Sequence, residues 1–471
     1  MENNFLNGLI LRHFVHTPTA DQSAALAKML DFLSSPAQEL FLLKGYAGTG
    51  KTSLISALVK SFREINYRVV LLAPTGRAAK VFSAYADTKS FTIHKKIYRQ
   101  RRSSGNTAEF QLAENLHKDT LFMVDEASMI GNSAAGGEMF GSGRLLDDLV
   151  EFVYTGERCR LMLIGDTAQL PPVMQAVSPA LDMETLRNYW FSVEETILRQ
   201  VVRQSEESGI LSNATALRTT LDEHGTALFP KIRTAGYTDI QTITGSDLIE
   251  ALSSAYSKSG IEDTIVITRS NKQANRYNQG IRNRILSREE EISAGDLLIV
   301  AKNNYFWTEA MEDFDFIANG EVVEVVRVRK QYELYGLRFA DLLVRFRDYD
   351  IETEVKILLD GLTSETASIS KEMSDHLFTS VWEDYSDIRT KRARMEKLKK
   401  DPHFNALVVK YAYAVTCHKA QGGQWSDVFV DIGYVMDDFL GDDFYRWLYT
   451  AVTRATGRLY FVNLPKRMME E

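Results

Sequence analysis

The chain has 471 residues, 45% of them hydrophobic, so it is long enough to bury the cores of about three domains. Its 55 basic and 63 acidic residues give a net charge of −8, which argues against a nucleic-acid partner unless basic side chains gather in a local patch. The two cysteines, Cys159 and Cys417, indicate neither a disulfide framework nor a metal site, and no apolar stretch approaches the length of a membrane span.

Four short apolar runs in the first third of the chain end in polar or glycine-rich turns. Continuous apolar runs of this length are typical of strands buried on both faces of a parallel sheet. The segment KTSLISALVKSFREI has the pattern of a crossover helix, so the order predicts a doubly wound α/β domain. The four runs are LFLLKG (40–45), RVVLLAPTG (68–76), TLFMVDEAS (120–128) and RLMLIGD (160–166).

The segment GYAGTGKT matches the complete G-x-x-x-x-G-K-[ST] pattern and lies between a predicted strand and a predicted helix. In such a loop backbone N–H groups wrap phosphates, Lys51 reaches the β and γ oxygens, and the Thr52 hydroxyl ligates Mg²⁺. We therefore predict a nucleotide site. Its predicted binding residues in this loop are Gly45, Ala47, Gly48, Thr49, Gly50, Lys51, Thr52 and Ser53.

An Asp-Glu pair, Asp125 and Glu126, follows the third apolar run. Asp125 is placed to hold Mg²⁺, and Glu126 is placed to polarise an attacking water. Alone, such a pair after a strand is more often a helix cap and a first-turn acid. Because it follows a phosphate-binding loop by about seventy residues, the catalytic interpretation is favoured here.

The segment GDTAQLPPV begins at the C-terminal end of the fourth predicted strand. Ligands of open α/β sheets bind at this edge, so Gln169 is placed to reach a γ-phosphate or the attacking water. Pro171 and Pro172 stiffen the turn, because each fixes its own φ angle and restricts the preceding residue. A rigid strand exit without a catalytic role is the other interpretation.

A second α/β domain is predicted by four later runs, with a β-rich insertion at about 295–360 that predicts a small antiparallel barrel or sheet. The segment RTKRARMEKLKK (389–400) then places seven basic residues in twelve positions, and a solvated helix face is as good an interpretation as a binding patch. The four runs are DTIVITRSN (263–271), ALVVKYAYAVT (406–416), WSDVFVDIG (425–433) and RLYFVN (458–463).

Together these motifs resemble those of superfamily-one DNA helicases of the 5′-to-3′ class, the Pif, RecD and Dda group, in the family's order and over most of the chain. TADQSAAL (19–26) resembles the adenine-reading segment with Gln22, and GDTAQLPPV resembles motif III, which gives Gln169 a role in coupling ATP state to DNA contact. LRQVVRQ (198–204) resembles motif IV with Arg203, and YTAVTRATGRLYFV (449–462) resembles motif VI with Arg454.

The resemblance implies ATP and Mg²⁺ as ligands in a cleft between two domains, with Thr52 and Asp125 holding the metal. An arginine from the second domain would act as a finger in cis on the transferred phosphoryl group. For Arg454, an exposed helix arginine is the other interpretation. The implied catalytic residues are Lys51, Glu126, Gln169, Arg203 and Arg454.

Contacts with single-stranded DNA are implied by segments that resemble motifs Ia, Ib and V. These are LLAPTGRAA (71–79), FTIH (91–94) and YAVTCHKAQGGQWSDV (413–428). A lone histidine is more often a packed or surface residue, so the assignment of the two histidines as DNA contacts depends most on the resemblance. The implied DNA contacts are Thr75, His94, Thr416, His418 and Lys419.

The expected fold is therefore α/β, with two RecA-like doubly wound parallel-sheet domains, a small β-hairpin insertion and an SH3-like β-rich insertion. The first domain is expected over 1–190, with a wedge hairpin at about 96–117. The second is expected to start at 191–294 and to end at 406–471. The SH3-like insertion would span 295–365 and a basic helical segment 366–405.

The expected function is that of an ATP-dependent DNA helicase that translocates 5′ to 3′ on single-stranded DNA and unwinds duplex junctions, as a monomer on DNA. Its setting would be intracellular, cytoplasmic or nucleoid-associated, in DNA repair, replication or recombination. Two alternatives stay open: a single-strand translocase subunit of a larger nuclease or repair assembly, and a nucleic-acid-binding scaffold whose ATPase has decayed. No nuclease motif and no targeting segment is recognised in the sequence.

Overall fold

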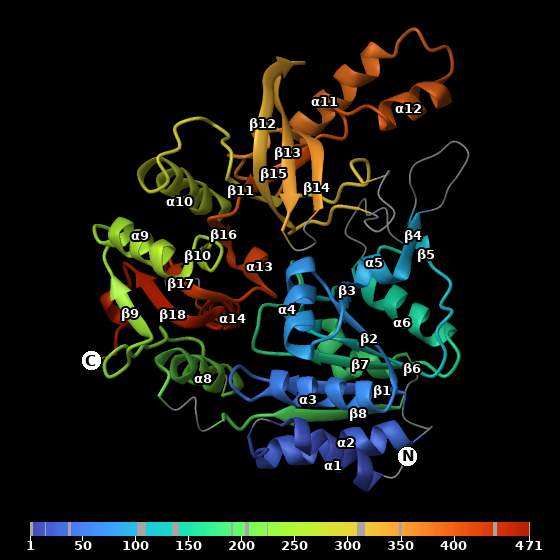
Figure 1. Cartoon of the computed structure of the whole chain (residues 1–471). Helices are drawn as coiled ribbons and strands as arrows, with labels where there is room; N and C mark the ends of the chain where they lie inside the picture. Colours follow the sequence, from blue (N-terminus) through green and yellow to red (C-terminus); the bar gives the residue numbers. More distant parts are fainter. Residues whose placement is uncertain are drawn as a thin grey trace.

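The computed structural model describes residues 3–14, 16–35, 39–100, 110–133, 141–189, 192–202, 207–223, 225–308, 316–347, 351–436 and 440–470. Two parallel sheets lie side by side, and a β-barrel with a helical arm stands above them (Figure 1). Among the described residues, none of the helices combines the length and the apolar character needed to span a bilayer.

The first sheet has six parallel strands in the order β3-β2-β6-β7-β1-β8. Alternate side chains enter two cores: Leu40 and Leu42 pack with α5 and α6, whereas Phe41 and Leu43 pack with α1 to α4. Because both faces are buried, the strands appear in the sequence as continuous apolar runs. The expected doubly wound domain is confirmed. Its strands are β1 (Leu40–Gly45), β2 (Arg68–Ala73), β3 (Ser90–Thr92), β6 (Thr120–Val124), β7 (Arg160–Gly165) and β8 (Val193–Leu198).

Four helices cover one face of this sheet and three further helices cover the other. The first group comprises α1 (Asn3–His13), α2 (Ala20–Ser34), α3 (Lys51–Glu64) and α4 (Gly76–Ala86). The second comprises α5 (Ile93–Ile97), α6 (Leu145–Thr155) and α7 (Met183–Arg187).

Strand β8 corrects the expected domain boundary after residue 190. It pairs in parallel with β1, from Leu40 opposite Val193 to Gly45 opposite Leu198, so the first sheet extends to residue 198. As an edge strand it carries two acidic residues, Glu194 and Glu195, and therefore lacks the continuous apolar run of the inner strands.

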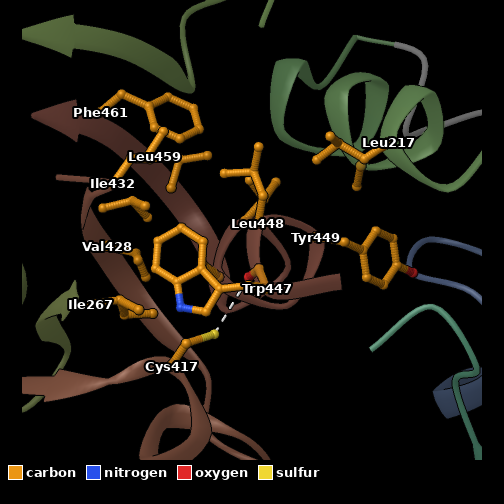
Figure 2. Packing of buried hydrophobic residues seen from close by; sticks show 14 of the residues in the cluster. Leu217, Ile267, Cys417, Val428, Ile432, Trp447, Leu448, Tyr449, Leu459 and Phe461 are labelled. Atoms are coloured by element: carbon orange, nitrogen blue, oxygen red, sulfur yellow. Dashed lines mark hydrogen bonds between the residues drawn. The ribbon is translucent and has the colours of Figure 1, made fainter. Parts of the chain in front are cut away.

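The second sheet has five parallel strands in the order β16-β10-β17-β18-β9. Val428 and Val430 pack with α8 and α14, whereas Phe429 packs toward α9 and α10 on the opposite face. Figure 2 shows the first of these cores, with Val428, Leu459 and Phe461 beside the helix that carries Trp447 and Leu448. The second expected doubly wound domain is confirmed. Its elements are β9 (Ile240–Ile243), β10 (Thr264–Thr268), β16 (Ala414–Thr416), β17 (Trp425–Asp431), β18 (Ala455–Val462), α8 (Gly209–Asp222), α9 (Leu248–Ser259), α10 (Asn271–Arg284), α13 (Cys417–Ala420) and α14 (Asp442–Val452).

The expected β-rich insertion is a closed barrel of five strands. The run 406–416, expected as one strand of the second domain, is divided: Leu407–Tyr411 closes the barrel and Ala414–Thr416 joins the second sheet. Both parts are apolar because both cores bury them, so the sequence did not mark the break. The barrel strands are β11 (Leu297–Val300), β12 (Val322–Leu334), β13 (Leu337–Phe346), β14 (Ile351–Leu358) and β15 (Leu407–Tyr411).

A two-stranded hairpin, β4 (Tyr98–Gln100) with β5 (Phe110–Leu112), lies within the segment expected to hold it, and its residues 101–109 are outside the described part. The Phe110 ring lies 4.5 Å from that of Tyr305 and 6.2 Å from that of Phe316. Both partners belong to the connection between β11 and β12. The hairpin of the first domain therefore packs against the barrel of the second.

The basic segment forms part of a helical arm, α11 (Lys371–Asp384) and α12 (Lys391–Lys399), which extends from the barrel (Figure 1). Leu377, Val381 and Leu398 share a small core with barrel side chains. Arg394 of α12 lies 4.2 Å from the ring centre of Trp382, so one of the seven basic residues packs within the arm.

Candidate active site between the two domains

The phosphate-binding loop connects the end of β1 at Gly45 with the start of α3 at Lys51. Gly48 and Gly50 adopt φ angles of +73° and +78°, in the left-handed region that disfavours other residues. A Cβ atom on Gly50 would lie 2.2 Å from Nε2 of Gln22. The loop therefore depends on glycine both for its backbone angles and for close contact with α2.

Gln22, the predicted adenine-reading residue, holds this loop to α2. Its Nε2 donates to the carbonyl of Thr49 at 3.0 Å, and its Oε1 accepts from the N–H of Thr19 at 2.9 Å. The side chain is buried. The structure thus places Gln22 against the loop, with one N–H and one oxygen lone pair of its amide beyond these two bonds.

Lys51 lies at the centre of the loop. Its Nζ donates to the carbonyls of Gly45 and Tyr46, the latter at 3.0 Å, and lies 3.9 Å from Oδ2 of Asp166. Asp166 directly follows β7 and is buried. Burial raises the pKa of Asp166, and the nearby Lys51 ammonium opposes that rise.

Asp125 follows the last residue of β6. Its Oδ2 accepts from the Tyr85 hydroxyl at 2.6 Å, and its Oδ1 accepts from the N–H of Glu126 at 2.8 Å. Burial raises its pKa, and the Tyr85 hydrogen bond works against the rise. Each carboxylate oxygen of Asp125 keeps a lone pair for a cation, and Mg²⁺ prefers such oxygen ligands when phosphates supply the others. Thr52, in the first turn of α3, stays the predicted second ligand.

Glu126, Gln169 and Arg454 meet where the two domains face each other. Arg454 Nη1 lies 3.7 Å from Glu126 Oε1. In the amide orientation that satisfies both neighbours, Gln169 donates to Glu126 Oε2 at 3.3 Å and accepts from Arg454 Nη2 at 3.1 Å. Gln169 and Arg454 are buried, at 7% and 3% exposure. These three of the five predicted catalytic residues thus form one bridge between the two domains.

Arg454 follows α14 and is fixed by its own domain. Its Nε donates to the carbonyl of Thr450 at 3.1 Å and its Nη1 to that of Gly423 at 3.3 Å. Burial raises the pKa of Glu126, and the Arg454 charge opposes this. Arg454 is therefore a buried interdomain cation, and the alternative of an exposed helix arginine is wrong.

The turn that contains Gln169 also touches the second domain through its backbone. The N–H of Leu170 donates to Oγ1 of Thr450 at 2.9 Å, and Nε2 of Gln421 donates to the carbonyl of Leu170 at 2.7 Å. Arg446 donates to the carbonyl of Thr167. The segment is therefore an interdomain contact, which a simple rigid strand exit does not explain.

A groove of about 430 Å³ runs between α4, the barrel and α13. Thr75, His418 and Lys419, three of the five predicted DNA contacts, are among its lining residues. Gln421, which contacts the Gln169 turn, lines it too. The groove and the Glu126–Gln169–Arg454 bridge are therefore connected by one hydrogen-bonded residue.

Lys419 is the unusual cation of this groove. Its Nζ is buried and makes no hydrogen bond to the described residues, and burial lowers its pKa to about 8. A buried ammonium without an acceptor is costly, which an anionic ligand in the groove would relieve. His418 is exposed, but partial desolvation of its ring lowers its pKa, and Asp443 opposes this.

The other two predicted DNA contacts, His94 and Thr416, are not among the lining residues of the groove. His94 lies in α5, with its ring 5.7 Å from that of Tyr98. Burial lowers the pKa of His94 to about 4, so its ring is neutral near pH 7. Arg203, the predicted motif IV arginine, falls outside the described residues, although Val202 just before it donates its N–H to the carbonyl of Gly48 at 3.0 Å.

Comparison with known families agrees with this arrangement. A family described as "AAA domain" matches residues 17–229, and one described as "UvrD-like helicase C-terminal domain" matches residues 411–462. The first match contains the phosphate loop, Glu126 and Gln169, and the second contains Lys419 and Arg454. These two matches, in the order of the motifs, support a superfamily-one helicase of the Pif1/RecD-like group. It is the group that the sequence motifs resemble.

The individual relatives are distant. Protein R530 of Acanthamoeba polyphaga mimivirus is 23% identical over 94% of this chain and 99% of its own length. The ATP-dependent RecD2 DNA helicase of Deinococcus radiodurans is 31% identical over 41% of this chain, which covers 23% of that protein. The structure of Bacteroides Pif1 bound to single-stranded DNA has 16% identity and a TM-score of 0.47, covering 97% of this chain and 95% of the other.

Three residues of the site were missed from the sequence. Asp166 and Tyr449 lie inside segments that were recognised, GDTAQLPPV and YTAVTRATGRLYFV, but only Gln169 and Arg454 were singled out in them. Tyr85 lies in α4 and reaches Asp125 only in the folded domain. A tyrosine in a helix has no local pattern that distinguishes a core ring from a hydrogen-bonding one, so the sequence offered no signal for Tyr85.

Proposed function

We propose that this protein is an ATP-dependent DNA helicase that translocates 5′ to 3′ on single-stranded DNA and unwinds duplex DNA, acting as a monomer on intracellular DNA. The observation that carries the proposal is the bridge from Glu126 through Gln169 to Arg454. Glu126 and Gln169 belong to the domain with the phosphate loop, whereas Arg454 belongs to the other domain. ATP hydrolysis at this bridge would therefore change how the two domains are held together.

The chain's own residues divide the work of phosphoryl transfer, which needs positioning and charge neutralisation more than covalent help. Lys51 and the loop amides would hold the phosphates, and Arg454 would neutralise charge that develops on the transferred group. Glu126 would orient the attacking water, and Gln169 would hold both side chains in register. Mg²⁺, held by Thr52 and Asp125, would neutralise phosphate charge.

Single-stranded DNA is proposed to lie in the groove lined by Thr75, His418 and Lys419. The buried ammonium of Lys419 supports an anionic occupant. The ATP-dependent RecD2 DNA helicase of Deinococcus radiodurans, which is similar to part of this chain, supports the same substrate class. His94 and Thr416 stay predictions, because the groove does not include them.

The test is an unwinding assay with purified protein and two duplexes of equal sequence, one with a 5′ single-stranded tail and one with a 3′ tail. We expect ATP-dependent opening of the 5′-tailed duplex alone. Opening of only the 3′-tailed duplex would reverse the proposed polarity. DNA-stimulated ATP hydrolysis without opening of either would favour a translocase subunit, and no hydrolysis at all would favour a scaffold.

A further inference from the structure

Tyr449 of α14 connects the second domain directly to the phosphate-binding loop. Its hydroxyl accepts from the N–H of Ala47 at 2.8 Å and donates to Oδ2 of Asp166 at 2.6 Å. The residue is 1% exposed. Figure 2 shows its ring directed away from Leu459 and Phe461, with the hydroxyl toward the blue ribbon of the first domain.

Asp166 extends this contact to the catalytic lysine. Its Oδ2 lies 3.9 Å from Nζ of Lys51, and its Oδ1 accepts from the N–H of Ala168, the residue before Gln169, at 2.9 Å. One hydroxyl of the second domain is therefore hydrogen-bonded to the loop backbone and to a carboxylate that borders both Lys51 and the Gln169 turn. Burial and Asp166 raise the pKa of Tyr449 far above its usual value, so the hydroxyl stays protonated as a donor.

The neighbouring loop residue faces the second domain as well. The hydroxyl of Tyr46 donates to Asp222 of α8 at 3.3 Å, and the guanidinium of Arg218 lies 4.4 Å from its ring centre. Tyr46 and Ala47 are variable positions of the motif, whereas the following residues supply most of the phosphate-binding atoms. One side of the loop thus serves the nucleotide and the other contacts the partner domain.

We propose that Tyr449 is a positioning residue that couples the state of the phosphate-binding loop to closure of the two domains. The inference rests on the proposed function and names a residue of the same site. When the domains separate, water satisfies the Ala47 N–H and the Asp166 carboxylate. When they close, both groups are buried, and only the Tyr449 hydroxyl satisfies them together.

Removal of this hydroxyl therefore penalises the closed arrangement and leaves the open one unchanged. The nucleotide and DNA both favour the closed arrangement, so binding of one raises the affinity for the other. When the closed arrangement is penalised, this coupling free energy becomes smaller. Without DNA, the nucleotide binds to the open arrangement, in which Lys51 and the loop amides hold the phosphates and the Tyr449 hydroxyl makes no contact.

The experiment compares Tyr449→Phe with Tyr445→Phe, a matched control one turn earlier on α14. Tyr445 is also buried, and its hydroxyl donates to the carbonyl of Leu228, inside the second domain, at 2.9 Å. Two readouts are taken for each protein: the ratio of single-stranded DNA affinities with and without a non-hydrolysable ATP analogue, and the ratio of ATP turnover with and without DNA.

For Tyr449→Phe we expect both ratios to move toward one, the affinity ratio by about fivefold or more, with analogue affinity without DNA near wild type. Tyr445→Phe should keep wild-type ratios. Each ratio is taken within one protein, so a change in the fraction folded does not alter it. Unchanged ratios in Tyr449→Phe, or equal losses in both variants, would overturn the inference. If wild type itself shows no DNA-stimulated turnover, the proposed function fails instead.

Discussion

The two doubly wound domains share an architecture but not a chemistry, and the difference lies in how one strand passes into one helix. In the first domain, the residue before the helix that follows β1 is Gly50. Glycine has no side chain, so it cannot cap the N–H groups of the first helical turn. In the second, the helix after β10 begins behind Ser270, whose hydroxyl accepts from the N–H of Gln273 at 3.2 Å. A helix start that caps itself has fewer free amides for a phosphate.

This comparison shows that apolar runs specify the layers, whereas the residues between them specify the site. The second domain lacks the phosphate loop but contributes Arg454 and Tyr449 to it. Under the proposed function, neither domain alone holds a complete set of groups for hydrolysis. Substitutions in each domain should therefore give effects that a one-domain site would not show.

The largest expected effect comes from the second domain. Arg454→Ala should lower ATP turnover by about 10³- to 10⁵-fold, the range for loss of an arginine finger. Analogue binding to the loop should persist, which fluorescence titration would check. Arg276→Ala, an exposed arginine of α10, is the control. A turnover near wild type in Arg454→Ala would show that the first domain hydrolyses ATP unaided.

The next effect tests the first domain. Glu126→Gln should lower turnover by about 10²- to 10⁴-fold, because the water loses its base, while ATP and Mg²⁺ still bind. Lys51→Ala should lose turnover together with nucleotide affinity. Glu151→Gln, on the exposed side of α6, is the matched control. Steady-state kinetics with wild-type rates in either site variant would contradict the assignment of this site.

Gln169→Ala tests the connection between the domains. We expect a loss of most DNA-stimulated hydrolysis and unwinding, with nucleotide affinity close to normal because Lys51 and the loop amides are untouched. Gln175→Ala is the control: it changes a glutamine of the same loop whose side chain bonds only Ser133, at 3.2 Å, among the described residues. A Gln169→Ala variant with a lowered melting temperature but an unchanged ratio of stimulated to basal turnover would have a structural role only.

The smallest effect concerns pH and the DNA groove. The pKa of Lys419 is lowered to about 8 by burial, and a bound phosphate would raise it, so DNA binding takes up a proton above that pH. Affinity should be constant from pH 7 to about 8 and weaken above it, by at most about tenfold per pH unit. Lys419→Arg, which stays charged, should flatten the profile. A wild-type profile without this bend, measured at constant salt, would place the DNA elsewhere.

Several parts of the fold and site followed from local sequence. Buried strands of both sheets were predicted because each is a continuous apolar run, and the phosphate loop because its glycines, Lys51 and Thr52 occur at fixed spacing. Arg454 and Gln169 were indicated by the resemblance of their segments to family motifs. The structure brings both to Glu126. Arg203 stays a prediction.

Other parts depended on contacts between distant segments. Sequence placed β8 in the wrong domain and merged β15 with β16, because an edge strand with acidic residues and a break inside an apolar run leave no local pattern. The hydroxyl of Tyr449 reaches Ala47 across 402 positions of sequence. Local composition sets which residues are buried and which backbone angles are possible, whereas only tertiary packing decides which polar groups are buried opposite each other. In this protein, tertiary packing places the Tyr449 hydroxyl of the second domain against the Ala47 N–H of the phosphate-binding loop.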